Sequence, residues 1–162
     1  MSRVSDSKLA TLKRRAQRAA SLAYAPYSGF TVGAAVLTGT GEIFAGANVE
    51  NVSYGLSICA ERNAVQQAAA HGARRIAAIV VYTPTSEPTP PCGACRQVLA
   101  EFGSETLVVC CGKGGRVSRH RLRELLPDAF GVDKLGLSIQ VRTGSATART
   151  AAKHRQSRRR RS

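Results

Sequence analysis

Hydrophobic and polar positions follow two different periods along the chain, and these periods predict helices and strands in alternation. Within residues 5–23, apolar residues recur every three or four positions, as in an amphipathic helix. Apolar runs at residues 30–37 and 76–82 instead predict strands, the second of them buried. The other expected elements are strands at residues 42–47, 106–111 and 116–118, and helices at residues 57–72, 93–102 and 118–126.

Turn residues separate these elements and set their order. Gly39-Thr40-Gly41 joins the first two strands into an expected hairpin, and four prolines within residues 83–91 predict a loop. Helices therefore alternate with strands through a single domain. This order predicts an α/β fold with one mixed sheet of about five strands and helices on its faces.

Composition is consistent with a globular domain. The chain has 162 residues, of which 43% are hydrophobic, so it is long and apolar enough to bury a core. No stretch approaches the ~20 apolar residues of a membrane-spanning helix. The basic, polar N-terminus has no apolar segment typical of a secretory signal. We therefore expect a cytoplasmic protein with no membrane partner.

Charge divides the chain into two parts. Its formal net charge is +14, and by itself this value favours a nucleic-acid partner. Residues 141–162, however, hold eight basic residues, no acidic residue and few apolar ones. We expect a catalytic domain at residues 1–140 and a disordered basic tail at residues 141–162. Such a tail attracts polyanions weakly and in a salt-sensitive way, so any nucleic-acid binding is expected to be weak and tail-mediated.

Three of the five cysteines have the spacing of a metal site. Cys92 and Cys95 lie three residues apart at the start of a predicted helix, and Cys59 lies at the start of another. Helix N-termini favour thiolates, and three sulfurs leave one tetrahedral position of a zinc ion open, as in catalytic zinc sites. Cys110 and Cys111 fall in a predicted buried strand, where we expect core thiols.

Glu61 converts this metal site into a hypothesis of catalysis. It follows Cys59 by two positions, so its carboxylate can move a proton to and from water at the metal without being a ligand. Arg62 and Arg96 directly follow ligand cysteines, and their guanidinium groups are expected to hydrogen-bond to the sulfurs. Cys-Ala-Glu followed by Pro-Cys-Gly-Ala-Cys is a signature of zinc-dependent deaminases.

Six segments in this order resemble the small homotetrameric cytidine deaminases. They are Ala25-Pro-Tyr-Ser, Phe30-Thr-Val-Gly-Ala-Ala, Gly46-Ala-Asn-Val-Glu-Asn, Cys59-Ala-Glu-Arg-Asn-Ala, Pro91-Cys-Gly-Ala-Cys-Arg-Gln-Val and Glu124-Leu-Leu-Pro-Asp-Ala-Phe. The resemblance implies a three-layer α/β/α sandwich. It also implies the zinc-dependent hydrolysis of cytidine or 2′-deoxycytidine to the uridine product and ammonia, as in pyrimidine salvage.

The resemblance also implies roles for individual residues. Cys59, Cys92 and Cys95 match the ligands of one Zn²⁺ per subunit, and Glu61 matches the proton shuttle. The substrate-binding positions matched are Phe30 against the pyrimidine, Asn48 and Glu50 at the ribose 3′-hydroxyl, and the Ala60 N–H at the base. Tyr54 and Phe130 match positions that complete the pocket across subunits of a homotetramer.

The residues themselves support part of this assignment. Asn48 and Glu50 are two positions apart, so a strand would direct both side chains to one face. An amide and a carboxylate there can donate to and accept from a sugar hydroxyl, and a buried pair of this kind rejects a substrate without it. Without the zinc motif, the same residues would indicate only an ordinary polar turn after a strand.

Three other functions share some of these features. A polynucleotide-editing deaminase is favoured by the tail and by Lys13, Arg14, Arg15 and Arg18, but it usually has a His-x-Glu pattern. A deaminase of a nucleoside antibiotic such as blasticidin S would lack the Asn-Val-Glu-Asn sugar motif. A zinc-stabilised module that binds polyanions would retain the metal but would not turn over cytidine.

Overall fold

The first apolar run forms a strand that is buried along its whole length. In the computed structural model, which describes residues 4–135, this strand is β1 (Gly33–Thr38). Ala34 and Val36 join one cluster of core residues, whereas Ala35 and Leu37 join a second cluster on the opposite face of the sheet. Because both faces of β1 are covered, the run has no polar alternation.

Four further strands extend β1 into one mixed sheet. The order is β2-β1-β3-β4-β5, with β2 at Ile43–Ala47, β3 at Ile76–Tyr82, β4 at Leu107–Cys111 and β5 at Val117–Arg121. β3 and β4 are parallel, and every other neighbouring pair is antiparallel. The parallel pair is joined by a helical crossover, as parallel strands require.

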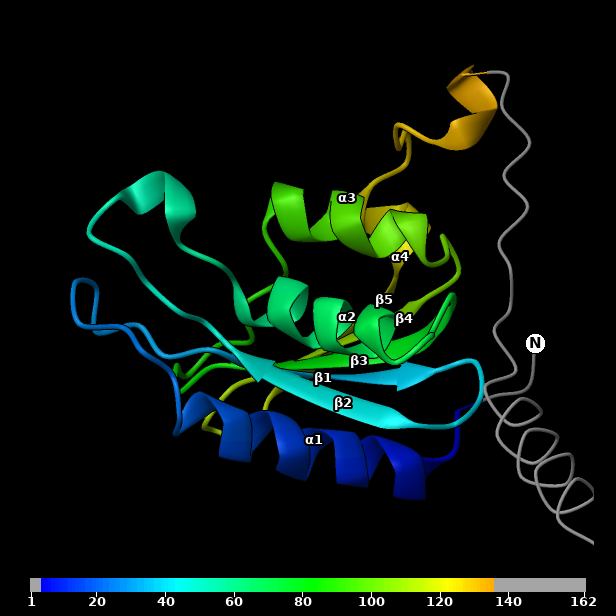
Figure 1. Cartoon of the computed structure of the whole chain (residues 1–162). Coiled ribbons are helices and arrows are strands. Elements are labelled where there is room, and N and C mark those ends of the chain that lie inside the picture. Colours follow the sequence, from blue (N-terminus) through cyan, green and yellow to red (C-terminus); the bar gives the residue numbers. More distant parts are fainter. Residues whose placement is uncertain (1–3, 136–162) are drawn as a thin grey trace, which may run out of the picture.

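Helices cover both faces of this sheet (Figure 1). α1 (Asp6–Ala20) lies on one face, and α2 (Ala60–Ala70), α3 (Gly93–Glu101) and the short α4 (Leu122–Leu125) lie on the other. Two 3₁₀ turns, Tyr54–Leu56 and Val132–Leu135, complete the described elements. The predicted three-layer α/β/α architecture with a five-stranded mixed sheet is confirmed.

A glycine sets the close approach of α2 to the sheet. A Cβ atom at Gly46 of β2 would lie 2.6 Å from the Ala64 nitrogen and 2.8 Å from the Ala60 carbonyl oxygen. Both distances are far below ordinary contact, so only glycine lets the first turn of α2 rest on β2. This contact holds the N-terminus of α2 in place.

Several elements differ from their predicted bounds because of contacts between distant residues. Residues 57–59 are not helical, because Ile58 exchanges backbone hydrogen bonds with Val49 and α2 begins only at Ala60. Residues 118–121 are not helical, because Ser118 pairs with Cys110 inside β5, and α4 begins only at Leu122. β5 alternates exposed and half-buried residues, as an edge strand does.

The predicted tail at residues 141–162 lies outside the described residues, so the division of the chain at residue 140 remains a prediction. Within residues 4–135, no helix is both long enough and apolar enough to cross a membrane.

Candidate active site

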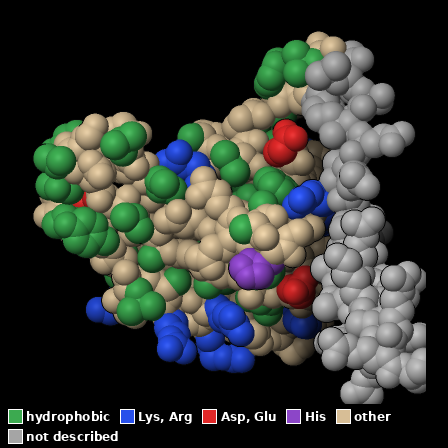
Figure 2. Space-filling model, viewed as in Figure 1, with side chains coloured by type: hydrophobic (Ala, Val, Ile, Leu, Met, Phe, Trp, Pro, Cys, Tyr) green, Lys and Arg blue, Asp and Glu red, His purple; other side chains and the backbone are tan. Residues whose placement is uncertain are grey.

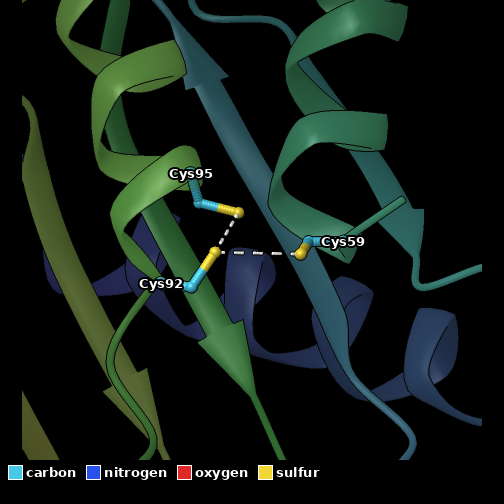
Figure 3. Close-up of side chains that lie close together, drawn as sticks. All are labelled: Cys59, Cys92 and Cys95. Atoms are coloured by element: carbon cyan, nitrogen blue, oxygen red, sulfur yellow. Dashed lines mark hydrogen bonds between the residues drawn. The ribbon is translucent and has the colours of Figure 1, made fainter. Parts of the chain in front are cut away.

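The N-termini of α2 and α3 bring three cysteine sulfurs together. Cys59 and Cys92 occupy the positions that directly precede α2 and α3, and Cys95 lies in the first turn of α3 (Figure 3). The Cys92 sulfur is 3.9 Å from that of Cys59 and 3.5 Å from that of Cys95, and all three lie within 4.8 Å of one another. Tetrahedral zinc with bonds of about 2.3 Å would place its sulfurs about 3.8 Å apart. The donor set therefore fits one zinc ion.

The protonation of the cluster also favours a cation. The pKa of the Cys59 thiol falls to about 5, because Cys95 donates a hydrogen bond to it and Arg62 lies beside it. The pKa of the Cys95 thiol is raised, because the same hydrogen bond and burial favour its neutral form. Three sulfurs at this distance ionise together only when a positive ion lies between them. Cys95 is buried and Cys92 is exposed, so the site is open to solvent on one side.

Glu61 is the only charged side chain that is buried among the described residues, with 5% of its surface exposed. It lies in the first turn of α2, beside the Cys95 thiol. Burial raises the pKa of its carboxyl group, and the negative charge of Cys59 raises it further. A carboxyl group whose pKa is raised holds a proton more readily, which suits a group that takes up and delivers protons in general acid–base catalysis.

The two arginines that follow ligand cysteines have different partners. The Arg62 guanidinium lies 3.8 Å from the Cys59 sulfur as a hydrogen-bond donor and also donates to the Ser57 carbonyl at 2.9 Å. Arg96 instead donates to the carbonyls of Pro91 and Leu125, at 2.8 and 2.9 Å. The expected hydrogen bond from Arg96 to a sulfur is therefore not found among the described residues, because these two carbonyls take its donors. The two bonds instead hold Pro91, the residue before Cys92, and join α3 to the end of α4.

Asn48 and Glu50 both hold the segment that leads into β1. The Asn48 side chain accepts from the Val32 N–H and donates to the Phe30 carbonyl, each at 2.8 Å. Glu50 accepts from the backbone of Tyr27 and from both donors of Ser28. Although β2 ends at Ala47, the extended backbone of residues 48–50 directs both side chains toward residues 27–32.

The remaining predicted residues lie at four different places. Tyr54 lines an open groove of about 440 Å³ with Tyr27, Ser28, Glu50 and Ser57, and its ring meets Tyr27 edge to face at 6.1 Å. Ala60 is fully buried at the start of α2. Phe130 does not line this groove; its carbonyl accepts from Gln97 of α3 at 2.7 Å. The Phe30 ring is exposed, and its backbone is tied to Asn48.

Ser28 is a residue of this site that sequence reasoning did not assign. It lies within one of the segments that resemble the family, but nothing local distinguishes it from other loop serines. Its contact with Glu50 joins residues 22 apart in the chain, so it becomes visible only in the fold.

Comparison with known proteins identifies the family of this site. Residues 6–111 match the model of the cytidine and deoxycytidylate deaminase zinc-binding region. The chain belongs to this deaminase family. The cytidine deaminase of Halalkalibacterium halodurans is 48% identical over 120 residues, which are 74% of this chain and 91% of that protein. The cytidine deaminase of Mycobacterium tuberculosis H37Rv is 45% identical over 124 residues, which are 76% of this chain and 90% of that protein.

Solved structures of this family have the same fold. The crystal structure of the cytidine deaminase from Burkholderia pseudomallei superposes with a TM-score of 0.72 at 49% identity, covering 75% of this chain and 98% of that one. The crystal structure from Mycobacterium tuberculosis gives a TM-score of 0.68 at 42% identity, covering 79% and 99%. The deaminase fold therefore accounts for about three quarters of this chain.

Proposed function

We propose that the chain hydrolyses cytidine and 2′-deoxycytidine to uridine and 2′-deoxyuridine with release of ammonia. One observation carries this proposal: three sulfurs lie within 4.8 Å of one another at two helix N-termini, with the buried Glu61 carboxyl group beside them. Relatives named cytidine deaminase, 45% and 48% identical over about three quarters of the chain, support the same substrate class.

The proposed mechanism uses three cysteine ligands for the metal and one carboxyl group that carries protons. Cys59, Cys92 and Cys95 hold one zinc ion per subunit, which supplies the Lewis acidity that makes water nucleophilic near neutral pH. Glu61 takes a proton from the attacking water and delivers it to N3 of the base as C4 becomes tetrahedral. It then takes the proton of the new C4 hydroxyl and passes it to the amino group, so that the C4–N bond breaks, the C4 carbonyl forms and ammonia leaves. Arg62 offsets part of the negative charge of the sulfurs.

The residues before β1 and after β2 bind the nucleoside in this proposal. Asn48 and Glu50 take a sugar hydroxyl, Phe30 packs on the pyrimidine ring, and the Ala60 N–H with Glu61 contacts the base. The open groove beside Glu50 and Tyr54 supports this placement, because the sugar side of the site is accessible.

The position of the basic residues favours a free nucleoside over a polynucleotide. Arg14, Arg15 and Arg18 line a groove of about 670 Å³ along α1 and the edge strand β2, which also reaches Gln67 of α2. α1 lies on the face of the sheet opposite α2 and α3, which carry the cysteines (Figure 1). The groove includes neither Glu61 nor any of the three cysteines, so a polynucleotide attracted by these arginines would not be directed to Glu61. We expect nucleic-acid binding to be weak and carried by the tail.

The proposed function also includes a homotetrameric assembly, a cytoplasmic location and a role in pyrimidine salvage. The aromatic end of the molecule consists of the exposed side chains of Tyr24, Tyr27, Phe30, Val49, Val52, Tyr54 and Leu56 (Figure 2). An apolar surface of this kind supports a homotetramer in which Tyr54 and Phe130 complete neighbouring pockets. We place the catalytic domain at residues 1–140, followed by the basic tail, and assign the enzyme to cytoplasmic pyrimidine salvage.

An absorbance assay on the full chain with zinc tests this function. Ultraviolet absorbance should fall with cytidine and with 2′-deoxycytidine, and should stay constant with a cytosine-containing single-stranded oligonucleotide. Glu61→Gln removes the proton carrier, so kcat should fall by at least about 10²-fold while zinc stays at one ion per chain.

Glu101→Gln, an exposed substitution on α3, is the matched control and should retain full turnover. Turnover of the oligonucleotide alone would favour the editing deaminase. A zinc-loaded chain without turnover of any of these substrates would favour the binding module. Activity of Glu61→Gln within tenfold of the wild type would remove Glu61 from the mechanism.

A further inference from the structure

Ser28 joins two parts of the nucleoside site through a single oxygen atom. Its hydroxyl donates to Oε1 of Glu50, and the same oxygen accepts from the Phe30 N–H at 3.0 Å. The backbone N–H groups of Tyr27 and Ser28 donate to Oε2 of Glu50 at 2.9 and 3.2 Å. The carboxylate is therefore held at both oxygens by one short segment of chain.

These hydrogen bonds leave Glu50 little capacity for a ligand. A carboxylate offers about four acceptor positions, and Tyr27 and Ser28 occupy three of them. One position on Oε1 remains. The Ser28 hydroxyl is also the largest contribution that lowers the pKa of Glu50, so the carboxylate stays ionised and accepts only.

Asn48 uses half of its side-chain hydrogen-bonding capacity on the same segment. Its Oδ1 accepts from the Val32 N–H, and its Nδ2 donates to the Phe30 carbonyl, each at 2.8 Å. One N–H and one Oδ1 acceptor position of Asn48 are left for a ligand, together with the one acceptor position of Glu50. A hydroxyl group both donates and accepts, so this pair matches one sugar hydroxyl.

We propose that Ser28 is a positioning residue that makes Glu50 selective for a single sugar hydroxyl. The inference rests on the proposed deaminase function and on the sugar-binding roles of Asn48 and Glu50. Ser28 fixes the plane of the carboxylate and occupies one side of Oε1, so the open acceptor position has one direction. Because the same hydroxyl anchors the Phe30 N–H, the sugar contact and the aromatic contact keep a constant separation.

Variants that differ only in the hydroxyl test this role. Ser28→Thr retains the hydroxyl, whereas Ser28→Val has nearly the same shape without it, and Ser28→Ala removes it with less bulk. The kcat and KM of each are measured with 2′-deoxycytidine and with 2′,3′-dideoxycytidine, which lacks the 3′-hydroxyl. Ser53→Ala is the matched control, because this exposed serine belongs to the same end of the molecule and its side chain does not cap the adjacent turn.

The hydroxyl should act on binding and on selectivity rather than on chemistry. For Ser28→Ala and Ser28→Val, we expect KM for 2′-deoxycytidine to rise about tenfold or more, as for loss of a hydrogen bond to a charged group. Their kcat should change by less than about threefold, because Glu61 and the sulfurs are untouched. The kcat/KM preference for 2′-deoxycytidine over the dideoxynucleoside should fall by a similar factor of about ten. Ser28→Thr and Ser53→Ala should keep the wild-type preference.

Two results would overturn the role of Ser28. One is an unchanged preference in Ser28→Ala and Ser28→Val, whether or not both nucleosides lose activity equally, and the other is a loss in Ser28→Thr as large as in Ser28→Val. Each would mean that the serine supports only the loop. A wild-type chain that is inactive on 2′-deoxycytidine would overturn the proposed function and this assignment together, so the two failures are distinguishable.

Discussion

The cysteines of this chain differ in chemistry because their surroundings differ. Cys59 lies at a helix N-terminus beside Arg62, and its pKa falls to about 5 with a hydrogen bond from Cys95 as the main cause. Cys110 lies in the interior of β4, where burial raises its pKa to about 11. The first environment stabilises a thiolate and suits a metal, whereas the second keeps a neutral thiol in the core. The separation of ligand cysteines from core cysteines follows from these surroundings.

The raised pKa of Cys110 makes stability depend on alkaline pH. A thiol in the unfolded chain has an ordinary pKa of 9.0, so above this pH the unfolded chain loses a proton that the folded chain keeps until about pH 11. The contribution of this thiol is complete below pH 9 and is lost as pH rises through 11. Between pH 8.5 and 10.5, wild type should therefore lose about 2 kcal/mol more unfolding free energy than Cys110→Ala.

Urea unfolding at the two pH values measures this difference. Val109→Ala is the matched control, because it removes apolar volume from the neighbouring position of β4 without removing a titratable group. It should lower stability equally at both pH values. If Cys110→Ala loses as much stability with rising pH as the wild type does, the thiol is not the titrating group.

At the scale of elements, the site depends on how closely α2 approaches β2. α2 begins directly after Cys59, and Gly46 is the residue against which its first turn rests. A Cβ atom there would lie 2.6 Å from the Ala64 nitrogen, which is backbone and cannot rotate away. Movement of α2 by even a fraction of this overlap would displace Cys59 relative to α3.

Gly46→Ala should therefore reduce both stability and activity. We expect the unfolding free energy to fall by about 1–3 kcal/mol, as for other overpacked cores. The value of kcat should fall about tenfold or more, because Cys59 and Glu61 shift together with the helix. Urea unfolding and cytidine turnover measure the two effects. Gly114→Ala is the control, because its Cβ would meet only the Ser86 carbonyl oxygen at 3.6 Å; equal effects in both variants would contradict this account.

The same elements show how far sequence patterns predict this structure. Local periodicity predicts the type of nearly every element, because the apolar residues of β1, β3 and β4 and the stripe of α1 are continuous in the chain. The start of α2 and the end of β5 depend on partners elsewhere, Val49 and β4 respectively, so local patterns miss them. The cysteine spacing predicts the sulfur cluster, whereas the bonds of Arg96 and Ser28 become visible only after folding.

At the scale of the whole molecule, the arginines of α1 and the residues of the candidate active site lie on different faces of the sheet. The groove with Arg14, Arg15 and Arg18 adjoins α1, whereas the sulfurs and Glu61 lie at α2 and α3 on the other face. We expect substrate to reach the sulfurs from the aromatic end, whose exposed hydrophobic side chains lie on the face that Figure 2 shows. We therefore expect these three arginines to contribute little to catalysis, and we expect the aromatic end to serve both substrate entry and contact between subunits.

The aromatic end should therefore control assembly. Val52 belongs to it, is 76% exposed and carries no charge. In a homotetramer that buries this end, Val52→Glu would place an unpaired carboxylate in an apolar interface, at a cost of several kcal/mol. Light scattering should show wild type at about four times the 17.1 kDa mass of one chain, and Val52→Glu at a lower mass.

Activity then tests whether neighbouring subunits share a pocket. Val117→Glu, a matched charge at an exposed apolar residue of the distant strand β5, should leave the mass and turnover unchanged. If Tyr54 and Phe130 complete the pocket of a neighbour, dissociated Val52→Glu should keep its zinc but lose most cytidine turnover, because its ligands are intact and its pocket is open. Full turnover by the dissociated chain would show that each subunit has a complete pocket. A monomeric wild type would contradict the proposed interface itself.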